Sequence, residues 1–226
     1  MRDVSVILLA GGTGSRIGGS CPKQFLPLAG LPIALHSLRL LASLDDAREI
    51  VIVCQEMYKH HFLSFNAPCP ILFTPPGTRR QDSVRQGLLA TCKESSFICI
   101  HDSARPFLEQ KDLLRVIGSA KEKGASALAV PVKQTIKQID SLGIVEKTFD
   151  RSHLLEVQTP QVMRRDLLIQ GFEIAEKNTL SVTDDLSLVE LTGHPVTLIL
   201  GSSRNIKITT PEDLMLAEAM IRCAIK

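Results

Sequence analysis

The sequence has no marked excess of charge of either sign, no cysteine pair spaced for a metal and no long hydrophobic run. Lysine and arginine number 26 against 24 aspartate and glutamate residues, which gives a formal net charge of +2 at pH 7. We therefore expect no nucleic-acid partner and no membrane partner, and any cationic function must be local. No apolar stretch approaches the ~18 residues that are needed to span a bilayer.

The six cysteines form neither a CxxC pair nor a Cys/His cluster with zinc spacing. We expect reduced thiols that are mostly buried as small hydrophobic side chains, in a cytoplasmic protein. The first ten residues resemble a signal peptide, but Asp3 is misplaced for one and no small-residue cleavage site follows before the glycines.

The chain length fits a single domain, residues 1–226, with no linker or repeat to divide it. At this size roughly 70% of the unfolded surface can be buried, so a core needs no disulfide or metal. Short β-rich runs alternate with stretches of helical periodicity, which predicts an α/β fold with a mainly parallel, Rossmann-like sheet flanked by helices. The expected strands are residues 4–9, 50–54, 70–73, 97–100, 127–132 and 196–200, and the expected helices are 32–44, 81–92, 110–123, 164–176, 184–192 and 211–225.

Residues 133–150 break this rhythm with two alternating stretches around a Ser-Leu-Gly turn. The pattern predicts a protruding β-hairpin arm at about residues 133–152. A two-stranded ribbon is marginal on its own, so we expect the arm to pack on a second subunit. The alternative is a solvent-exposed hairpin with no partner.

A glycine-rich turn follows the first expected strand and is bounded by two cations, Arg16 and Lys23. Glycines without a Cβ let the backbone approach an anion closely and point successive amides toward it. The spacing matches neither the Walker pattern nor GxGxxG. Glycines alone are equally compatible with an ordinary strand-to-helix turn, but the two cations favour a polyphosphate site.

Asp102 follows the expected strand 97–100, so it should lie at the same sheet edge as the glycine turn. One carboxylate can hold Mg²⁺ when phosphate oxygens and water complete the shell, and Mg²⁺ is the cofactor that we expect. A helix-capping aspartate is the alternative. His101 and His153 belong to no nucleophile motif and are interpreted as structural.

Three further segments carry candidate site residues. The loop at 77–83 can surround a base or ribose with backbone groups and Ser83, although Arg79 and Arg80 could also be a solvated pair. Arg151, at the end of the arm, could reach a substrate phosphate across a subunit interface. A lysine flanked by isoleucines, such as Lys207, is more often solvated than catalytic. Asp184 and Asp185 are interpreted as serving a helix N-terminus.

Six motifs occur in one order along nearly the whole chain: GGxGxR at 11–16, PKQ at 22–24, GxxRxxSV at 77–84, HDxARP at 101–106, QTP at 158–160 and NIKITxPEDL at 205–214. Together they resemble the 2-C-methyl-D-erythritol 4-phosphate cytidylyltransferases of the non-mevalonate isoprenoid pathway. One such motif would be weak, but six in register are specific for cytidylyltransferases of sugar phosphates and polyol phosphates.

The resemblance implies a fold of the nucleotide-diphospho-sugar transferase type and a homodimer with exchanged arms. The implied reaction transfers CMP from CTP to 2-C-methyl-D-erythritol 4-phosphate, giving 4-diphosphocytidyl-2-C-methyl-D-erythritol and pyrophosphate. By the same resemblance, the residues are Arg16, Lys23, Arg151 and Lys207 for catalysis, Ala10, Gly11, Gly12, Gly14, Gly77, Arg80 and Ser83 for the nucleotide, and Asp102, Arg105, Thr135 and Thr159 for the acceptor, with Asp102 also matching the metal ligand.

Two alternatives stay open at this point. LeuAlaGlyGly at 9–12 and the motif around Lys207 also resemble ribitol-5-phosphate cytidylyltransferases, whereas residues 82–84, 135–137 and 150–151 fit the methylerythritol enzymes better. The second alternative is a nucleotide-sensing module that kept the fold without the chemistry.

The chemistry of the implied reaction agrees with a site rich in cations and poor in histidine. A phosphate monoester, with a second pKa near ~6, is largely dianionic at neutral pH and needs no general base. Catalysis then consists of holding two anions together and neutralising charge on the reacting oxygens.

Overall fold

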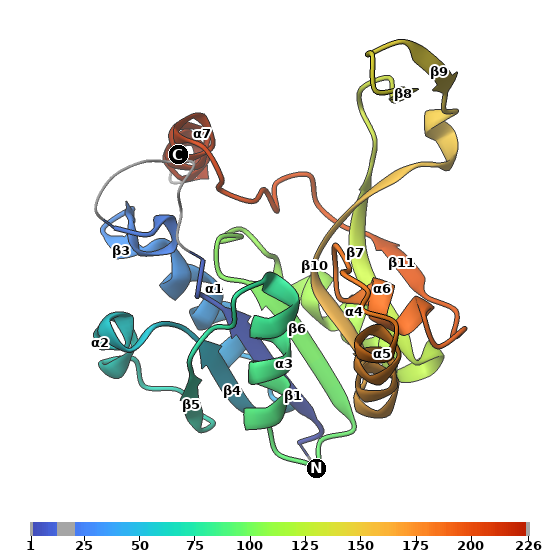
Figure 1. Cartoon of the computed structure of the whole chain (residues 1–226). Coiled ribbons are helices and arrows are strands. Elements are labelled where there is room, and N and C mark those ends of the chain that lie inside the picture. Colours follow the sequence, from blue (N-terminus) through green and yellow to red (C-terminus); the bar gives the residue numbers. More distant parts are fainter. Residues whose placement is uncertain (1, 13–20, 225–226) are drawn as a thin grey trace.

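The structure, a computed structural model, describes residues 2–12 and 21–224. Its central sheet consists of β1 (Val4–Leu9), β4 (Ala47–Val53), β5 (Ile71–Thr74), β6 (Phe97–Asp102), β7 (Ala125–Pro131), β10 (Leu155–Arg164) and β11 (Thr197–Leu200). These seven strands lie in the order β11-β7-β10-β6-β1-β4-β5 (Figure 1). β10 is antiparallel to both of its neighbours, and the other strand pairs are parallel.

Helices cover both faces of this sheet because successive side chains of a strand point to opposite faces. On β1, Val4, Val6 and Leu8 belong to one buried cluster, together with residues of α1 (Ile33–Ala42) and α4 (Gln110–Lys123). Ile7 belongs to the other cluster, with residues of α3 (Arg80–Ala90), α5 (Arg165–Lys177) and α6 (Leu186–Glu190). Burial on both faces explains why these strands read as near-continuous apolar runs.

The expected α/β fold with a mainly parallel sheet is confirmed. The first strand and the helix at 110–123 have the expected bounds, and the other expected strands and helices appear with ends shifted by a few residues. Five further short elements and the closing helix complete the regular structure of the described residues outside the arm. They are the 3-10 helix η1 (Lys23–Phe25), β2 (Pro27–Leu28), β3 (Leu31–Pro32), the 3-10 helix η2 (Glu56–Tyr58), α2 (His60–Leu63) and α7 (Pro211–Ala224).

One central strand, β10, was not predicted. Its register against β7 shifts between Val157 and Gln161, and the shift contains Pro160, which follows Thr159 through a cis peptide bond. A proline cannot donate to a strand ladder, and a proline within an apolar run is typical of an edge strand and not of a central one. The bulge accommodates it, and β10 thereby brings Thr159 beside the end of β6.

The predicted hairpin is present and protrudes from the rest of the molecule (Figure 1). It consists of β8 (Lys137–Ile139) and β9 (Val145–Thr148), every residue of which is exposed, and the 3-10 helix η3 (Arg151–His153) follows it. Apolar side chains of the hairpin are also exposed, including Ile139 at 57%, Ile144 at 62% and Leu142 at 82%. Within this chain the hairpin therefore has no core of its own.

Residues 201–210, which join β11 to α7, contribute to a small hydrophobic cluster that is separate from the two clusters on the sheet. Leu28 and Ile33 pack there with Ile208 and with Ala217 of α7. Ile208 also pairs with the sheet-edge turn, because its N–H donates to the carbonyl of Ala104. None of the helices in residues 2–12 and 21–224 has the length and apolar character that crossing a membrane requires.

The cysteines differ enough in burial to give a labelling prediction. Cys54, Cys69 and Cys99 are buried and Cys223 is exposed, and all are free thiols. Burial raises the pKa of Cys54 to about 11 and that of Cys99 to about 12. Because the thiolate is the reactive form, we expect N-ethylmaleimide at neutral pH to label Cys223 first and these two only after unfolding. Mass spectrometry of the native protein that found Cys99 labelled as fast as Cys223 would contradict this packing.

Candidate active site

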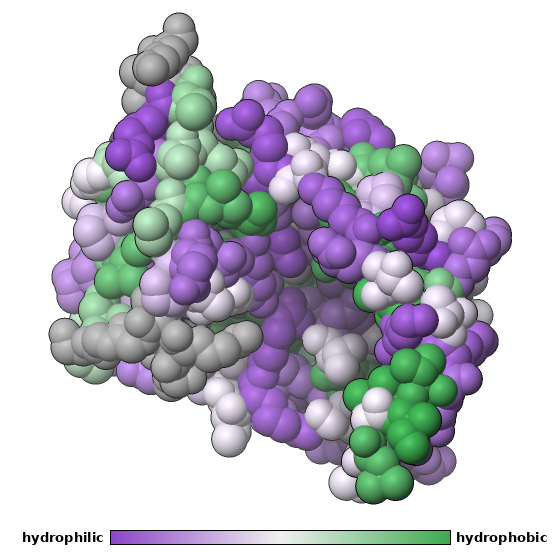
Figure 2. All heavy atoms as spheres, turned by 90° about the horizontal axis from the view of Figure 1, so that it is seen from above, coloured by the Kyte–Doolittle hydropathy of each residue, from purple (hydrophilic) through white to green (hydrophobic). Residues whose placement is uncertain are grey.

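A pocket of about 450 Å³ opens at the carboxyl edge of the sheet, where the ends of β1, β4, β5 and β6 meet. Seen from above, this face of the molecule is hollowed at its centre, and the walls of the hollow are mainly hydrophilic (Figure 2). Ligands of open α/β sheets bind at this edge. The lining residues that bear on the chemistry are Gly11, Gly12, Lys23, Gly77, Arg80, Ser83, Asp102 and Lys207.

The glycine turn contributes one wall of the pocket. Gly11 and Gly12 line it, whereas Ala10 is buried and its N–H continues the sheet by donating to Val53. A Cβ at Gly11 would overlap the ring of Pro76, so the backbones of the two loops approach more closely than alanine would permit. The predicted residues Gly14 and Arg16 lie outside the described part of the chain.

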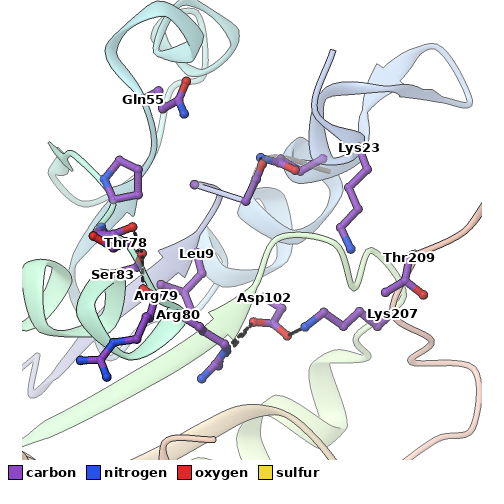
Figure 3. A pocket seen from close by; sticks show the side chains of 15 residues that line it. Leu9, Lys23, Gln55, Thr78, Arg79, Arg80, Ser83, Asp102, Lys207 and Thr209 are labelled. Atoms are coloured by element: carbon purple, nitrogen blue, oxygen red, sulfur yellow. Dashed lines mark hydrogen bonds and ion pairs between the residues drawn. The ribbon is translucent and has the colours of Figure 1, made fainter. Parts of the chain in front are cut away.

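The loop before α3 forms the wall opposite Lys23 (Figure 3). A Cβ at Gly77 would overlap Asp82, and the N–H of Gly77 donates to Ser83 Oγ over 3.1 Å. Arg79 forms a two-pronged ion pair with Asp82 and is largely exposed. Arg80, by contrast, points into the site, so the two arginines are not one solvated pair.

Asp102 lies between two cations at the floor of the pocket (Figure 3). Its Oδ2 is 2.7 Å from Lys207 Nζ, and its Oδ1 is 3.4 Å from Arg80 Nη2. Burial acts to raise the pKa of Asp102, but the charges of Arg80 and Lys207 outweigh it, and the pKa lies well below the usual range. The carboxylate is therefore charged, and Lys23 extends toward the Asp102–Lys207 pair from the wall of the pocket (Figure 3).

Asp185 belongs to the same charge network, although the sequence indicated only a helix-capping role. Asp184 does cap α6, because its Oδ1 accepts hydrogen bonds from the backbone and side chain of Ser187. Asp185 is 1% exposed and accepts two hydrogen bonds from Arg80, over 2.7 and 2.8 Å. The partners are 105 residues apart, so no local pattern could have indicated this pair.

Thr159 and His101 support the floor from below. The N–H of Asp102 donates to Thr159 Oγ1 over 3.0 Å, and this oxygen is 3.1 Å from Nδ1 of His101. His101 Nε2 is 3.2 Å from the carbonyl oxygen of Arg105. Burial lowers the pKa of His101 to about 4, so it is neutral at pH 7 and its Nε2–H can donate to that carbonyl. Both side chains thus hold the turn that carries Asp102.

A second pocket of about 310 Å³ adjoins the first, and Lys207 lines both. Arg105, Lys133 and Glu156 also line it, so three cations and one carboxylate surround this smaller space. Arg105 Nη1 donates to the carbonyl of Asn205 over 2.7 Å, which fixes its guanidinium next to the segment that carries Lys207. The arrangement suits a second anion adjacent to the first.

The two predicted site residues of the arm lie elsewhere. Arg151 and Thr135 are exposed, and Arg151 Nη1 donates to the carbonyl of Lys133 over 2.9 Å. Within the part of the chain that the structure describes, neither side chain lines the two pockets above. The single chain therefore brings together Lys23, Asp102, Arg105 and Lys207, but not Arg151 and Thr135.

A mainly parallel sheet with helices on both faces and a cation-lined pocket at its carboxyl edge places the chain in the class of α/β proteins that bind anionic ligands such as nucleotides. Within that class, the chain belongs to the 2-C-methyl-D-erythritol 4-phosphate cytidylyltransferase family, whose model matches residues 4–223. This confirms the resemblance carried by the six motifs and shows that the chain is an enzyme of this type.

Individual relatives and a solved structure support the same family assignment. The chloroplastic 2-C-methyl-D-erythritol 4-phosphate cytidylyltransferase of Oryza sativa subsp. japonica is 51% identical over 222 residues, which are 97% of this chain and 75% of the relative. The enzyme of the same name from Chlamydia pneumoniae is 39% identical over 98% of this chain and 100% of its own length. The crystal structure of 4-diphosphocytidyl-2C-methyl-D-erythritol synthase from Anaerococcus prevotii matches with a TM-score of 0.86 and 27% identity, over 98% of this chain and 99% of that one.

Proposed function

We propose that this chain transfers CMP from CTP to the phosphate of 2-C-methyl-D-erythritol 4-phosphate and releases pyrophosphate. The observation that supports this most strongly is the meeting of Lys23, Asp102 and Lys207 in one pocket, from three distant segments of the chain. The family to which the chain belongs carries the same activity in its name.

The two adjoining pockets suit the two substrates. CTP fits the larger pocket, with its triphosphate toward Gly11, Gly12 and Lys23, and the acceptor phosphate fits the smaller one. Lys207 lies between them and can contact both anions. The acceptor dianion attacks the α-phosphorus without a general base, the bond to the β-phosphate oxygen breaks, and pyrophosphate leaves with the electron pair. Lys23 and Lys207 neutralise charge on the phosphoryl oxygens as they react.

We further propose that Asp102 holds Mg²⁺ when CTP is bound. A carboxylate oxygen is a hard ligand that suits this ion. Asp102 already forms an ion pair with one cation, because Lys207 Nζ lies 2.7 Å from its Oδ2. Residues 2–12 and 21–224 contain no group of three or more acidic, histidine or cysteine side chains that could hold a metal alone. Phosphate oxygens and water must therefore complete the shell. Held there, the ion would supply positive charge beside the phosphates of CTP.

Pyrophosphate release with a panel of acceptors tests the function. We expect turnover with CTP and 2-C-methyl-D-erythritol 4-phosphate, and a kcat/KM at least tenfold lower with ribitol 5-phosphate. Equal or faster turnover with ribitol 5-phosphate would assign the chain to the polyol-phosphate branch. Tight CTP binding without turnover on either acceptor would support the nucleotide-sensing alternative.

We also propose a homodimer in which each arm reaches the active site of the partner. The apolar side chains of the hairpin are exposed in the single chain, and a two-stranded ribbon is marginal without support. The smaller pocket is lined by Lys133, whose carbonyl accepts a hydrogen bond from Arg151 at the base of the arm. An exchanged arm would supply Arg151 and Thr135 to a neighbouring acceptor site.

Mixed dimers test this exchange. Arg151→Ala should impair mainly the use of the acceptor, raising its KM at least tenfold, because a guanidinium that pairs with a phosphate is lost. Mixing Arg151→Ala with Lys23→Ala, each nearly inactive at a low acceptor concentration, should restore up to about one quarter of wild-type activity, since half of the chains form mixed dimers and each of these has one intact site. Activity no greater than the sum of the separate variants, in subunits shown to exchange, would contradict the proposal.

A further inference from the structure

One buried side chain in the lining of the phosphate pocket has no part in the mechanism above. Gln24 follows Lys23 in the 3-10 helix η1 (Lys23–Phe25) and is 2% exposed. Its Nε2 donates two hydrogen bonds, to the carbonyl of Ala10 over 2.7 Å and to that of Gly12 over 2.8 Å. Both protons of one carboxamide are thus used on the glycine turn.

These two bonds set the direction of the backbone dipoles in the turn. In a trans peptide the C=O and the next N–H point in opposite directions. Gln24 draws the Ala10 carbonyl toward itself, so the N–H of Gly11 must point the other way. Gly11 and Gly12 line the pocket, where an N–H attracts phosphate and a carbonyl oxygen repels it.

Neighbouring contacts hold Gln24 and the turn in place. Phe25 stacks on Tyr58 with ring centroids 4.6 Å apart and on His61 at 4.7 Å, which anchors η1 on η2 and α2. Gly11 lies so close to Pro76 that a Cβ would overlap the proline ring. The start of the glycine turn is therefore held in place by contacts with η1 on one side and with the loop that carries Pro76 on the other.

We propose that Gln24 is a positioning residue that orients the Gly11 amide, at the start of the glycine turn, for the pyrophosphate part of CTP. The proposal rests on the proposed function, in which this turn faces the triphosphate. Without the carboxamide, the buried carbonyl oxygen of Ala10 and the partly buried one of Gly12 lose their partner, and rotation of the peptides toward the pocket would place negative dipoles against the phosphates. An intact Gln24 prevents that rotation before the nucleotide arrives.

Isothermal titration with pyrophosphate, CTP and CMP in the presence of Mg²⁺ tests the proposal. Gln24→Met keeps the length of the side chain and removes both donors. We expect its Kd for pyrophosphate and for CTP to rise tenfold or more, and its Kd for CMP to rise less than threefold, because CMP lacks the outer phosphates. A general loss of packing would weaken all three ligands alike, and that result would overturn the proposal, as would an unchanged Kd for pyrophosphate.

A second variant carries a side chain at position 24 whose charge changes with pH. Gln24→Glu places a carboxylate against the two carbonyls at pH 8, and protonation at lower pH restores one donor. We expect the pyrophosphate Kd of this variant, relative to wild type, to improve at least threefold between pH 8 and pH 6. The absence of any such pH dependence, in protein that melts as a folded species, would count against the proposal.

Gln170 provides the matched control, because it is an exposed glutamine on α5 that lines neither of the two pockets. Gln170→Met and Gln170→Glu should change the Kd for pyrophosphate less than threefold, and a change as large as that of the Gln24 variants would overturn the proposal. Wild-type turnover is measured separately. If the wild type binds pyrophosphate but shows no turnover, the proposed function is wrong. The comparison of the Gln24 variants with wild type still tests the positioning role in that case.

Discussion

Lys23→Ala is expected to lower kcat by about 100-fold or more, because a preorganised charge at a transition state contributes on the order of 3 kcal/mol. Lys23 extends from the wall of the pocket toward the Asp102–Lys207 pair (Figure 3). Its ammonium can reach phosphate oxygens on which charge develops as pyrophosphate leaves. Steady-state kinetics with saturating CTP and acceptor measure the effect, and thermal melting should show a fold as stable as that of wild type.

Lys111→Ala is the matched control for this loss. Lys111 is an exposed lysine on α4 that pairs with Glu109 and does not line the pocket. Its removal should leave kcat within about twofold, because an exposed ion pair contributes little. A kcat near the wild-type value in purified Lys23→Ala would refute the catalytic role of Lys23.

Asp102→Asn is expected to lower kcat/KM by about 100- to 1000-fold at saturating Mg²⁺. The substitution keeps the shape of the side chain and removes the charge that Arg80 and Lys207 share. Two cations then face each other without their common carboxylate, and the proposed metal loses its protein ligand. Titration of activity with Mg²⁺ should show a half-saturating concentration raised at least tenfold.

The same substitution has a pH-dependent effect on stability. Burial alone would raise the pKa of Asp102, but Arg80 and Lys207 hold it below the usual value. A lowered native pKa stabilises the fold above the unfolded pKa of about 3.9, and this contribution is lost as the pH falls below it. The difference in free energy of unfolding between wild type and Asp102→Asn should therefore shrink between pH 6 and pH 3.

Asp46→Asn serves as the control for both measurements. Asp46 pairs with Lys121 and accepts a hydrogen bond from the N–H of Asp3, near the start of β1 at the opposite end of the strand from the pocket. Loss of this pair should leave kcat/KM within about twofold, because it is partly exposed and remote from the reacting groups. An equal loss of activity in Asp46→Asn and Asp102→Asn would show that the effect comes from general destabilisation.

Most of the sheet could be predicted because its strands are buried on both faces. β1 and β6 are apolar runs followed by glycine or acidic residues, and the helical period of α4 matches its observed bounds. β10 could not be predicted, since Pro160 interrupts it and three of the four residues at 158–161 are polar. Only the bulge against β7, which is a tertiary feature, makes that sequence compatible with a central strand.

The site residues also divide into those that the sequence could predict and those that it could not. Lys23 and Asp102 could be placed together because the glycine turn and the segment at 101–106 each follow a strand, and parallel strands end at one edge of the sheet. Asp185 and Gln24 could not be identified, because what they do depends on partners that folding brings to them. Asp185 meets Arg80 across 105 residues, and Gln24 serves two carbonyl groups that have no sequence signature.

A crystal structure of the protein with CTP and Mg²⁺ tests the convergence of charges most directly. The triphosphate should lie against Gly11, Gly12 and Lys23, with the metal bound to Asp102 and Lys207 moved away from that carboxylate toward the smaller pocket. Nucleotide density on another surface, or a triphosphate in this pocket with neither Lys23 nor a metal-bound Asp102 in contact with it, would contradict the proposed mechanism.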